Sequence, residues 1–381
     1  MNPDNSPIRL IFLVRSLDYG GAQRQLVALA KALNKDRFDV TVVCFYSGQP
    51  LEKELEGSDI RFITLAKRGR WDLVPFLFRL IRQLRMLRPD VVHSYLDVPN
   101  LLAILVRPLL HARVIWGIRA SEIELSNSNW LGRVAVFLER LFSRFPDLII
   151  VNSVAAHDSR VAKGYPSRKM VVIANGIDTG MFQPDREARA RIRREWRVAE
   201  DETIVGLVGR LDPVKDVPVF LRAATIVNRE IAAVRFVCVG DGPETYLAKL
   251  RALVSELGIV DSVTWVQARP DITAVYNGFD LLVSSSRSES LSNAVAEAMS
   301  CGVPCVVTDV GDLAILVGEY GVVVPPGDPE ALAAGVIKAL QNFKPETGLQ
   351  ARRRIVENYS VGKLAELTQA AINSVIRGHA T

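Results

Sequence analysis

Short hydrophobic runs alternate with amphipathic stretches along almost the whole chain. In the first half the runs are rich in Val, Ile and Leu, and helical patterns such as 22–33 and 130–145 separate them. Such runs predict strands that are buried on both faces of a parallel sheet, with helices as crossovers. The predicted strands are 8–15, 39–46, 60–65, 90–95, 112–118, 147–152 and 170–175.

The pattern pauses at 184–203, which is polar and charged and predicts a linker with a surface helix, and then starts again. We therefore expect an α/β protein with two doubly wound Rossmann-like domains, 1–183 and 184–360, that face a cleft. The tail, 361–378, predicts one more amphipathic helix. The strands predicted for the second domain are 204–210, 234–242, 262–267, 280–286, 304–309 and 321–328.

Length and charge fit this picture. A chain of 381 residues suggests two domains, because single cores stop growing near ~250–300 residues. The net charge is +5, but residues 1–180 hold 25 Lys and Arg against 17 Asp and Glu, a balance of +8, so the remainder is at −3. A basic first half predicts an acidic substrate, an anionic membrane surface or nucleic acid as its partner.

Targeting signals and cysteine usage suggest a compartment. The first residues show neither a basic region nor a small-residue cleavage site, and no apolar run reaches ~18 residues. The four cysteines lie on or beside apolar runs and predict buried, reduced thiols. We therefore expect a cytoplasmic protein, peripheral on the inner face of the membrane if it binds lipid.

Ligands of open parallel sheets bind at the carboxyl ends of the strands, so residues that follow strands are candidates. Gly20 and Gly21 lie between the first predicted strand and a helix. Glycine lets a ligand approach the backbone, and a helix N-terminus offers free N–H groups to phosphate. A plain tight turn fits these two residues equally well.

Two further candidates follow the fourth and fifth predicted strands. His93 is expected at the carboxyl end of 90–95, as a hydrogen-bonding or proton-handling group or as a structural histidine. Arg119 follows 112–118, where it would neutralise an acidic substrate or pair with Glu122 or Glu124. Together with Glu289, His93 and Arg119 are the candidate catalytic residues.

In the second domain, Arg210 and Lys215 flank the turn that Asp212 and Pro213 predict. Both cations are expected to converge on one point. Two cations at a turn suit a diphosphate, which spreads its negative charge over two phosphorus centres. A solvated charge cluster is the alternative.

Glu289 and Glu297 stand at the two ends of an otherwise uncharged helix start. The helix is predicted to begin near Ser290 or Ser292, because serine is a favoured N-cap. Backbone N–H groups of 291–294 would then be free for phosphate, at the positive end of the helix dipole. Glu289 would face a sugar and Glu297 would accept from a ribose diol. The alternative is a capped surface helix with incidental acids.

Taken together, these motifs resemble those of one family. They are "GGAQRQ" after the first strand, "NGID" at 175–178, "GRLDPVKD" at 209–216, "VGDGP" at 239–243, and "ESLSNAVAEAMSCGVPCVVTDVGD" from Glu289. In this order, and over nearly the whole chain, the sequence resembles a retaining glycosyltransferase of family 4 with the GT-B fold. The resemblance implies that a nucleotide sugar is the donor and that the terminal helix, 361–381, packs back on the first domain.

The resemblance also implies roles for single residues. Gly20 and Gly21 would approach the donor phosphate, Glu289 the donor sugar and Glu297 the ribose. It implies no cofactor and no metal, because protein cations take the place of a divalent ion. The residues implied for the donor diphosphate are Arg210, Lys215, Ser290, Leu291 and Asn293.

The chain departs from the family pattern at three positions. Arg119 occupies a place where relatives often carry histidine, and His93 stands alone where relatives often have two histidines. Asp312 replaces a second glycine, which resembles a subgroup.

The acceptor is suggested by residues 67–88, which alternate basic and apolar side chains. A basic amphipathic helix suits an anionic membrane surface, which predicts a lipid-linked acceptor or polysaccharide precursor. A helix that merely covers the sheet is the alternative.

Rival functions for the protein are a nucleotide-sugar epimerase and an RNA-binding protein. We expect no nucleic acid partner, because aromatic residues make up only 7% of the chain.

Overall fold

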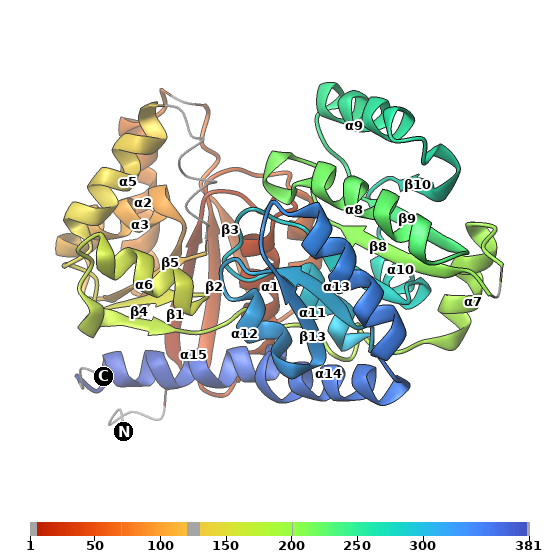
Figure 1. Ribbon diagram of the computed structural model, residues 1–381. Helices are drawn as coiled ribbons and strands as arrows, with labels where there is room; N and C mark the ends of the chain where they lie inside the picture. The colour runs from red at the N-terminus through yellow and green to blue at the C-terminus, as the bar shows by residue number, and fades with distance from the viewer. Residues whose placement is uncertain (1–5, 70, 120–129, 200, 379–381) are drawn as a thin grey trace. The chain divides into compact units, whose positions relative to one another are not determined.

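The computed structural model describes residues 6–69, 71–119, 130–199 and 201–378. The chain forms two compact units. The first comprises Met1–Gly176 together with Val361–Thr381, and the second comprises Ile177–Ser360. The terminal segment therefore belongs to the unit that contains the N-terminus, as Figure 1 shows by its colours.

The first unit contains a parallel sheet of seven strands in the order β3-β2-β1-β4-β5-β6-β7. All seven predicted strands are confirmed, with ends that shift by up to three residues. Side chains alternate along each strand: in β1, Leu10 and Phe12 enter one core, while Ile11 and Leu13 enter the other. The strands are β1 (Ile8–Val14), β2 (Phe38–Cys44), β3 (Arg61–Thr64), β4 (Val91–Tyr95), β5 (Arg113–Ile118), β6 (Leu148–Val151) and β7 (Met170–Val172).

Helices cover both faces of this sheet (Figure 1). One face packs against α1 (Gly21–Ala32), η1 (Pro50–Leu55) and the terminal helix α15 (Val361–Ile376). A Cβ atom on Gly176 would lie 2.8 Å from the Cα atom of Val361, so glycine permits the close approach of α15. The other face is covered by α2 (Val74–Leu87), α3 (Asp97–Val106), α5 (Trp130–Phe142) and α6 (Val154–Ala162), with the short turns η2 (Arg107–Leu109) and η3 (Ser167–Lys169) nearby.

The second unit repeats this plan with a parallel sheet of six strands, in the order β10-β9-β8-β11-β12-β13. All six predicted strands are again confirmed. The sheet order reverses between β8 and β11, and at such a point the following loops diverge and leave room for a ligand. The strands are β8 (Thr203–Val208), β9 (Val234–Val239), β10 (Val263–Val266), β11 (Leu281–Ser284), β12 (Cys305–Thr308) and β13 (Gly321–Val324).

One face of the second sheet packs against α8 (Val217–Glu230), α9 (Glu244–Glu256) and α13 (Pro329–Asn342). Next to β11 and β12 lie α11 (Asn293–Ser300) and α12 (Leu313–Val317), and α14 (Pro345–Asn358) packs against α11. The remaining elements are α10 (Ile272–Gly278) and the turns η4 (Pro213–Lys215), η5 (Val260–Ser262) and η6 (Gly318–Tyr320).

The polar segment 184–203 does contain the predicted surface helix, α7 (Arg186–Glu195). It is not a loose linker, however, because it packs on α10 and its following residue Trp196 is buried and stacked on Phe279, with ring centroids 5.9 Å apart. Arg189 and Arg193 both bind the carboxylate of Asp280. The segment is thus an integral part of the second unit.

The four cysteines are free and buried, as predicted. Burial raises the pKa of every one of these thiols, that of Cys44 to about 11 and that of Cys301 to about 12. They are therefore protonated and unreactive at neutral pH.

Candidate functional site

The loop after β8 is fixed by Asp212. One carboxylate oxygen accepts hydrogen bonds from the backbone N–H groups of Val214 (3.0 Å) and Lys215 (3.3 Å), and the other accepts from Arg210 Nε at 2.5 Å. An aspartate in this position caps the η4 turn. The Arg210 side chain therefore leans on its own loop and stays 64% exposed.

Lys215 reaches across to the loop after β11. Its ammonium group donates to Glu289 Oε1, which also accepts from Ser286 Oγ at 3.0 Å. We call Lys215, Ser286 and Glu289 the Lys215 cluster. The sequence led us to expect that Arg210 and Lys215 converge on one point. In this structure the two cations contact different carboxylates, and this convergence is not seen.

A second set of contacts, an ion pair and a hydrogen bond, connects the same two loops. Arg287 binds Asp216 through Nε (2.6 Å) and Nη2 (3.2 Å), and Ser285 Oγ donates to the carbonyl oxygen of Lys215 at 2.8 Å. Bidentate arginine–carboxylate pairs fix geometry as well as charge. The stem of Lys215 is therefore held in place from both of its ends.

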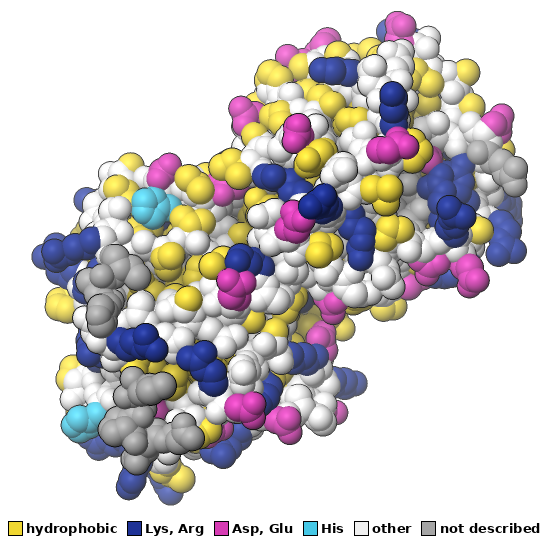
Figure 2. Space-filling view, turned by 90° about the horizontal axis from the view of Figure 1, so that it is seen from below, with side chains coloured by type: hydrophobic (Ala, Val, Ile, Leu, Met, Phe, Trp, Pro, Cys, Tyr) yellow, Lys and Arg dark blue, Asp and Glu magenta, His cyan; other side chains and the backbone are white. Residues whose placement is uncertain are grey.

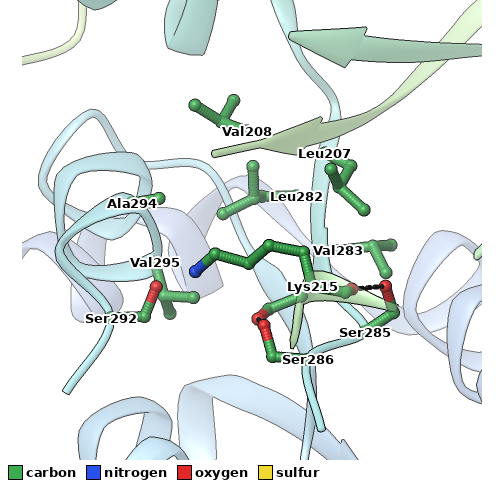
Figure 3. Close-up of a pocket in the computed structure, with 11 residues that line it drawn as sticks. Leu207, Val208, Lys215, Leu282, Val283, Ser285, Ser286, Ser292, Ala294 and Val295 are labelled. Carbon is green, nitrogen blue, oxygen red and sulfur yellow. Dashed lines mark hydrogen bonds between the residues drawn. The ribbon is translucent and has the colours of Figure 1, made fainter. Parts of the chain in front are cut away.

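A small cavity of roughly 10 Å³, room for about one water molecule, lies between these loops and α11. In Figure 3 the Lys215 side chain crosses this space, and its nitrogen points toward Ser292 and Val295 at the start of α11. The first backbone N–H groups of a helix have no partner within the helix and carry a partial positive charge. A cation and a helix N-terminus thus lie side by side at the carboxyl ends of β8 and β11.

The helix begins where the sequence predicts. Ser292 is the N-cap and Asn293 the first helical residue, although the Ser292 hydroxyl makes no capping hydrogen bond. Ser290 and Leu291 are buried in the turn that leads into α11. Glu297 lies in the second turn, where Tyr276 donates a hydrogen bond to its carboxylate at 2.7 Å. The buried tyrosine therefore orients the carboxylate that was expected to hold a ribose.

Gly311 is a site residue that the sequence motifs alone did not single out. It has a φ of +56°, and a Cβ atom there would lie 2.2 Å from the carbonyl oxygen of Glu289. The next residue, Asp312, donates its backbone N–H to the carbonyl oxygen of Ser290 at 3.1 Å. The loop after β12 thus packs directly beneath the turn that carries Glu289. The glycine before Asp312 in "DVGD" is the sequence feature that could have identified this position as a site residue.

Glycines also govern the loop after β9. A Cβ atom on Gly240 would lie 1.9 Å from the carbonyl oxygen of Gly209, and one on Gly242 would lie 2.0 Å from that of Leu211. The "VGDGP" motif therefore allows two strand-end loops to pack backbone against backbone, which supports the Arg210 loop.

The remaining candidates lie in the first unit. Gly20 precedes α1, is extended, and has no side-chain cap; Gly21 is the first helical residue and is exposed. Neither residue has a positive φ, and the Gln23 side chain lies against Gly20, where a Cβ atom would be 2.3 Å from Gln23 Oε1. The structure thus places both glycines at a helix N-terminus, as predicted.

His93 lies in the middle of β4, not at its carboxyl end, which corrects the expected position. Its side chain is 0% exposed between Phe12 and Tyr95, with ring centroids 5.4 Å and 4.8 Å away. Burial, and then the charge of Arg119, lower the pKa of His93 to about 3. The neutral, enclosed ring has the properties of a core residue rather than those of a proton carrier.

Arg119 directly follows β5 and is 8% exposed. Nη1 donates to Asn175 Oδ1 at 2.6 Å, and the guanidinium lies 5.3 Å from the centre of the Tyr95 ring. Glu122 and Glu124, its suggested partners, lie outside the described residues. Within the described part of the chain, no carboxylate pairs with Arg119.

Two family models match the chain in succession. Residues 19–180 match "Glycosyltransferase Family 4", and residues 202–342 match "Glycosyl transferases group 1". The first range falls largely in the first unit and the second lies within the second unit. The chain therefore belongs to the group 1 glycosyltransferases of family 4, a family of enzymes.

Curated relatives carry a consistent name. The D-inositol 3-phosphate glycosyltransferase of Thermobispora bispora is 26% identical over 399 residues, covering 94% of this chain and 92% of the relative. That of Segniliparus rotundus is 34% identical over 179 residues, 45% of this chain. The latter match spans only 39% of the relative's length.

Solved structures share the fold. Anabaena HepE in complex with UDP matches with a TM-score of 0.84 at 21% identity, covering 96% of this chain and 100% of that one. Sucrose-phosphate synthase from Thermosynechococcus elongatus matches with a TM-score of 0.78 at 18% identity, covering 97% and 100%. The fold is thus the GT-B fold, as predicted.

Among the described helices, none is long and apolar enough to cross a bilayer.

Proposed function

We propose that this chain transfers a sugar from a nucleoside diphosphate sugar, held by the second unit, to an acceptor, with retention of the anomeric configuration. The observation that carries this proposal is the position of the Lys215 ammonium beside the start of α11. A diphosphate fits such a site because both the cation and the helix N-terminus favour negative charge. The family match and the names of its relatives favour transfer over epimerisation or RNA binding.

The charges at the site serve the departing diphosphate. As the bond between the anomeric carbon and the diphosphate oxygen breaks, negative charge grows on that oxygen. The acceptor oxygen bonds to the anomeric carbon, and its proton passes to the departing diphosphate oxygen. Lys215, Arg210 and the α11 amides stabilise that charge most in the transition state. These cations do the work of a divalent ion, so we propose that turnover needs no metal or cofactor.

The two glutamates would bind hydroxyl groups. Glu289 is anchored by Lys215 and Ser286, and this leaves its second oxygen to accept from the donor sugar. Glu297, oriented by Tyr276, would accept from the vicinal hydroxyls of a ribose. HepE, a structural relative, binds UDP and UDP-glucose, so a uridine nucleotide is the first donor class to test.

The acceptor is proposed to be lipid-linked, at an anionic membrane surface, as in polysaccharide assembly. The helix α2 begins at Val74 rather than at 67, because Pro75 stands in its first turn. Its inner face buries Phe76, Leu80 and Leu84, as a sheet-covering helix should.

The outer face of α2 is also apolar. Phe78 is 70% exposed and Met86 66% exposed, and just before the helix Trp71 is 86% exposed. Basic side chains surround these groups in a shallow groove, lined by Phe78, Ile81, Arg82, Arg85, Met86 and Arg88. Figure 2, in which α2 is not labelled, shows one face of the molecule with Lys and Arg side chains among exposed hydrophobic ones. Exposed apolar groups ringed by cations suit an anionic bilayer surface. Arg70, part of the same basic segment, lies outside the described residues.

Screening nucleotide sugars by thermal stabilisation, followed by transfer and hydrolysis assays on the hits, tests the proposal. We expect one nucleotide sugar to raise the unfolding temperature and to turn over equally well with EDTA. The anomeric configuration of the product, read by NMR, tests retention. Stabilisation by no nucleotide sugar would contradict the proposed function, and loss of turnover in EDTA would contradict metal independence.

A further inference from the structure

The guanidinium of Arg119 is buried, and at least three of its five N–H donors are unused. Nη1 donates to Asn175 Oδ1, but Nε and Nη2 have no hydrogen-bond partner and both are inaccessible to solvent. The side chain as a whole is 8% exposed. Buried donors are almost always paired in folded proteins, so the three N–H groups on Nε and Nη2 call for a partner.

The charge of Arg119 is also uncompensated within the described part of the chain. Among the described residues, His93 and Tyr95 are titratable groups whose pKa Arg119 affects. His93 is neutral, because burial and Arg119 lower its pKa to about 3, and burial raises the pKa of Tyr95. Neither group supplies a negative charge at neutral pH. By contrast Arg160, another buried arginine of the first unit, donates to the carboxylate of Glu139 at 3.1 Å.

Two other arginines of the chain show what kind of group pairs with the Nε and Nη2 nitrogens of a guanidinium. Arg9 uses Nε (3.1 Å) and Nη2 (2.8 Å) to hold both oxygens of Asp90. Arg287 uses the same two nitrogens on Asp216. This edge of a guanidinium matches a planar or tetrahedral oxyanion with two parallel hydrogen bonds. In Arg119 the same two nitrogens are buried and have no hydrogen-bond partner.

The position of Arg119 favours a substrate over a structural ion. It follows the carboxyl end of β5, the side of a parallel sheet where ligands bind. Along the same edge Arg15 follows β1 and is exposed, and Lys67 follows β3; both lie about 6 Å from the ring of Tyr46, at 6.0 and 5.9 Å. Arg15, Lys67 and Arg119 are thus three cations that follow strands at this edge of the sheet.

We propose that Arg119 binds an oxyanion carried by the acceptor, a phosphate or a carboxylate, through Nε and Nη2. This deepens the proposed function, since it assigns an anionic acceptor to the first unit. The ion pair would form in a largely dry site, where a single oxyanion and a guanidinium attract strongly.

Thermal unfolding of the full chain tests this, with saturating UDP present so that a diphosphate site in the second unit is filled. Methyl phosphate, glucuronate and neutral glucose are titrated into the wild type, Arg119→Gln, Arg119→Lys and Arg37→Gln. Arg37 is a matched control, because it also donates to an asparagine, Asn373, but is exposed at the amino end of β2. Stabilisation by the nucleotide without anions is read first, and GDP or ADP replaces UDP throughout if UDP does not stabilise the chain. Stabilisation by none of these nucleotides would contradict the proposed function only.

We expect one of the two oxyanions to stabilise the wild type and Arg37→Gln saturably, and glucose to do nothing. Affinity should fall about tenfold or more in Arg119→Gln, and substantially in Arg119→Lys, which keeps the charge but loses the fork. The stronger oxyanion identifies phosphate or carboxylate. Equal stabilisation of wild type and Arg119→Gln, or of neither, overturns the proposal.

Two more measurements distinguish an acceptor site from a structural role and from a donor site. Without anions, Arg119→Gln should unfold at or above the wild-type temperature, because it removes an uncompensated buried charge. A variant that is markedly less stable, or that does not fold, would mean that the contacts of Arg119 with Asn175 and Tyr95 are its main role, and overturns the proposal. A preference for UDP-glucuronate over UDP-glucose that vanishes in Arg119→Gln would place the anion on the donor and also overturn it.

Discussion

The ammonium group of Lys215 donates a hydrogen bond to the carboxylate of Glu289, 74 positions further along the chain. The contact joins the loop after β8 to the loop after β11, the two strands between which the order of the second sheet reverses. It also keeps the cation next to the start of α11. The Glu289 carboxylate therefore positions the Lys215 ammonium group, the positive charge that a bound diphosphate would need.

Removing the cations should stop turnover. We expect Lys215→Ala to lower kcat by about 10²-fold or more, and Arg210→Ala to lower it similarly, because charge on the leaving diphosphate loses its stabilisation. Nucleotide-sugar hydrolysis is the assay. Arg222→Ala, on the neighbouring helix α8, is the control and should keep wild-type turnover. Intact turnover in the Lys215→Ala, Arg210→Ala double variant would show that the site is assigned to the wrong residues.

Glu297 should report on the ribose. Glu297→Gln replaces a charged acceptor by a neutral one and should weaken UDP binding by about 1–3 kcal/mol. Calorimetric titration with UDP and with 2′,3′-dideoxy-UDP measures this directly. The wild type should prefer UDP and the variant should lose most of that preference. Tyr276→Phe should give a smaller loss, since it removes only the hydrogen bond that orients the carboxylate. An undiminished preference in Glu297→Gln would refute the assignment.

Gly311→Ala should damage both stability and binding. The new Cβ atom would lie 2.2 Å from the carbonyl oxygen of Glu289, at a φ of +56° that favours glycine. We expect a loss of about 2 kcal/mol or more in stability and weaker UDP binding. Gly327→Ala is the control, since it shares a positive φ (+76°) but has nothing within 4 Å. Equal effects of the two substitutions would mean that backbone conformation, not the contact with the Glu289 turn, matters.

His93 should make the protein sensitive to acid. Its folded pKa of about 3 lies below the ordinary value of about 6.5, so between these values only the unfolded chain binds the proton. The stability that His93 contributes is present above pH ~6.5 and is lost as the pH falls toward about 3. At pH 4.5 the free energy of unfolding should have lost about 2–3 kcal/mol through His93.

Denaturant unfolding at pH 7.5 and 4.5 checks this expectation. His93→Phe keeps an aromatic ring between Phe12 and Tyr95 without a titrating group, and should lose less stability on acidification than the wild type does. The exposed His111 provides the control, and His111→Gln should follow the wild type. An unchanged acid loss in His93→Phe would exclude His93 as its source.

The outer face of α2 should control membrane binding. Sedimentation with vesicles of phosphatidylglycerol and phosphatidylcholine at low salt measures it. Phe78→Ser with Met86→Ser should reduce the bound fraction several-fold, because each removes exposed apolar area that would enter the interface. Arg82→Gln with Arg85→Gln should weaken binding to anionic vesicles, and added salt should do the same. Absence of wild-type binding to anionic vesicles would contradict peripheral attachment.

The sequence by itself determined the two sheets and the position of α11. Every predicted strand is present, because runs of Val, Ile and Leu separated by amphipathic helices have few other ways to bury both faces. The start of α11 at Asn293 also agrees with a local signal, the preference for serine at an N-cap, although Ser292 makes no capping hydrogen bond in this structure. Patterns of this kind depend on neighbours in sequence and can be read along the chain.

Tertiary structure decided which side chains meet. Arg210 lies on Asp212 while Lys215 reaches Glu289, and Gly311 passes beneath the Glu289 turn, because these partners are brought together by strand order rather than by spacing in the sequence. It also enclosed His93 within β4 and left Arg119 without an anion. A partner distant in sequence leaves no local periodicity, so only the packed fold shows which polar groups are paired and which await a ligand.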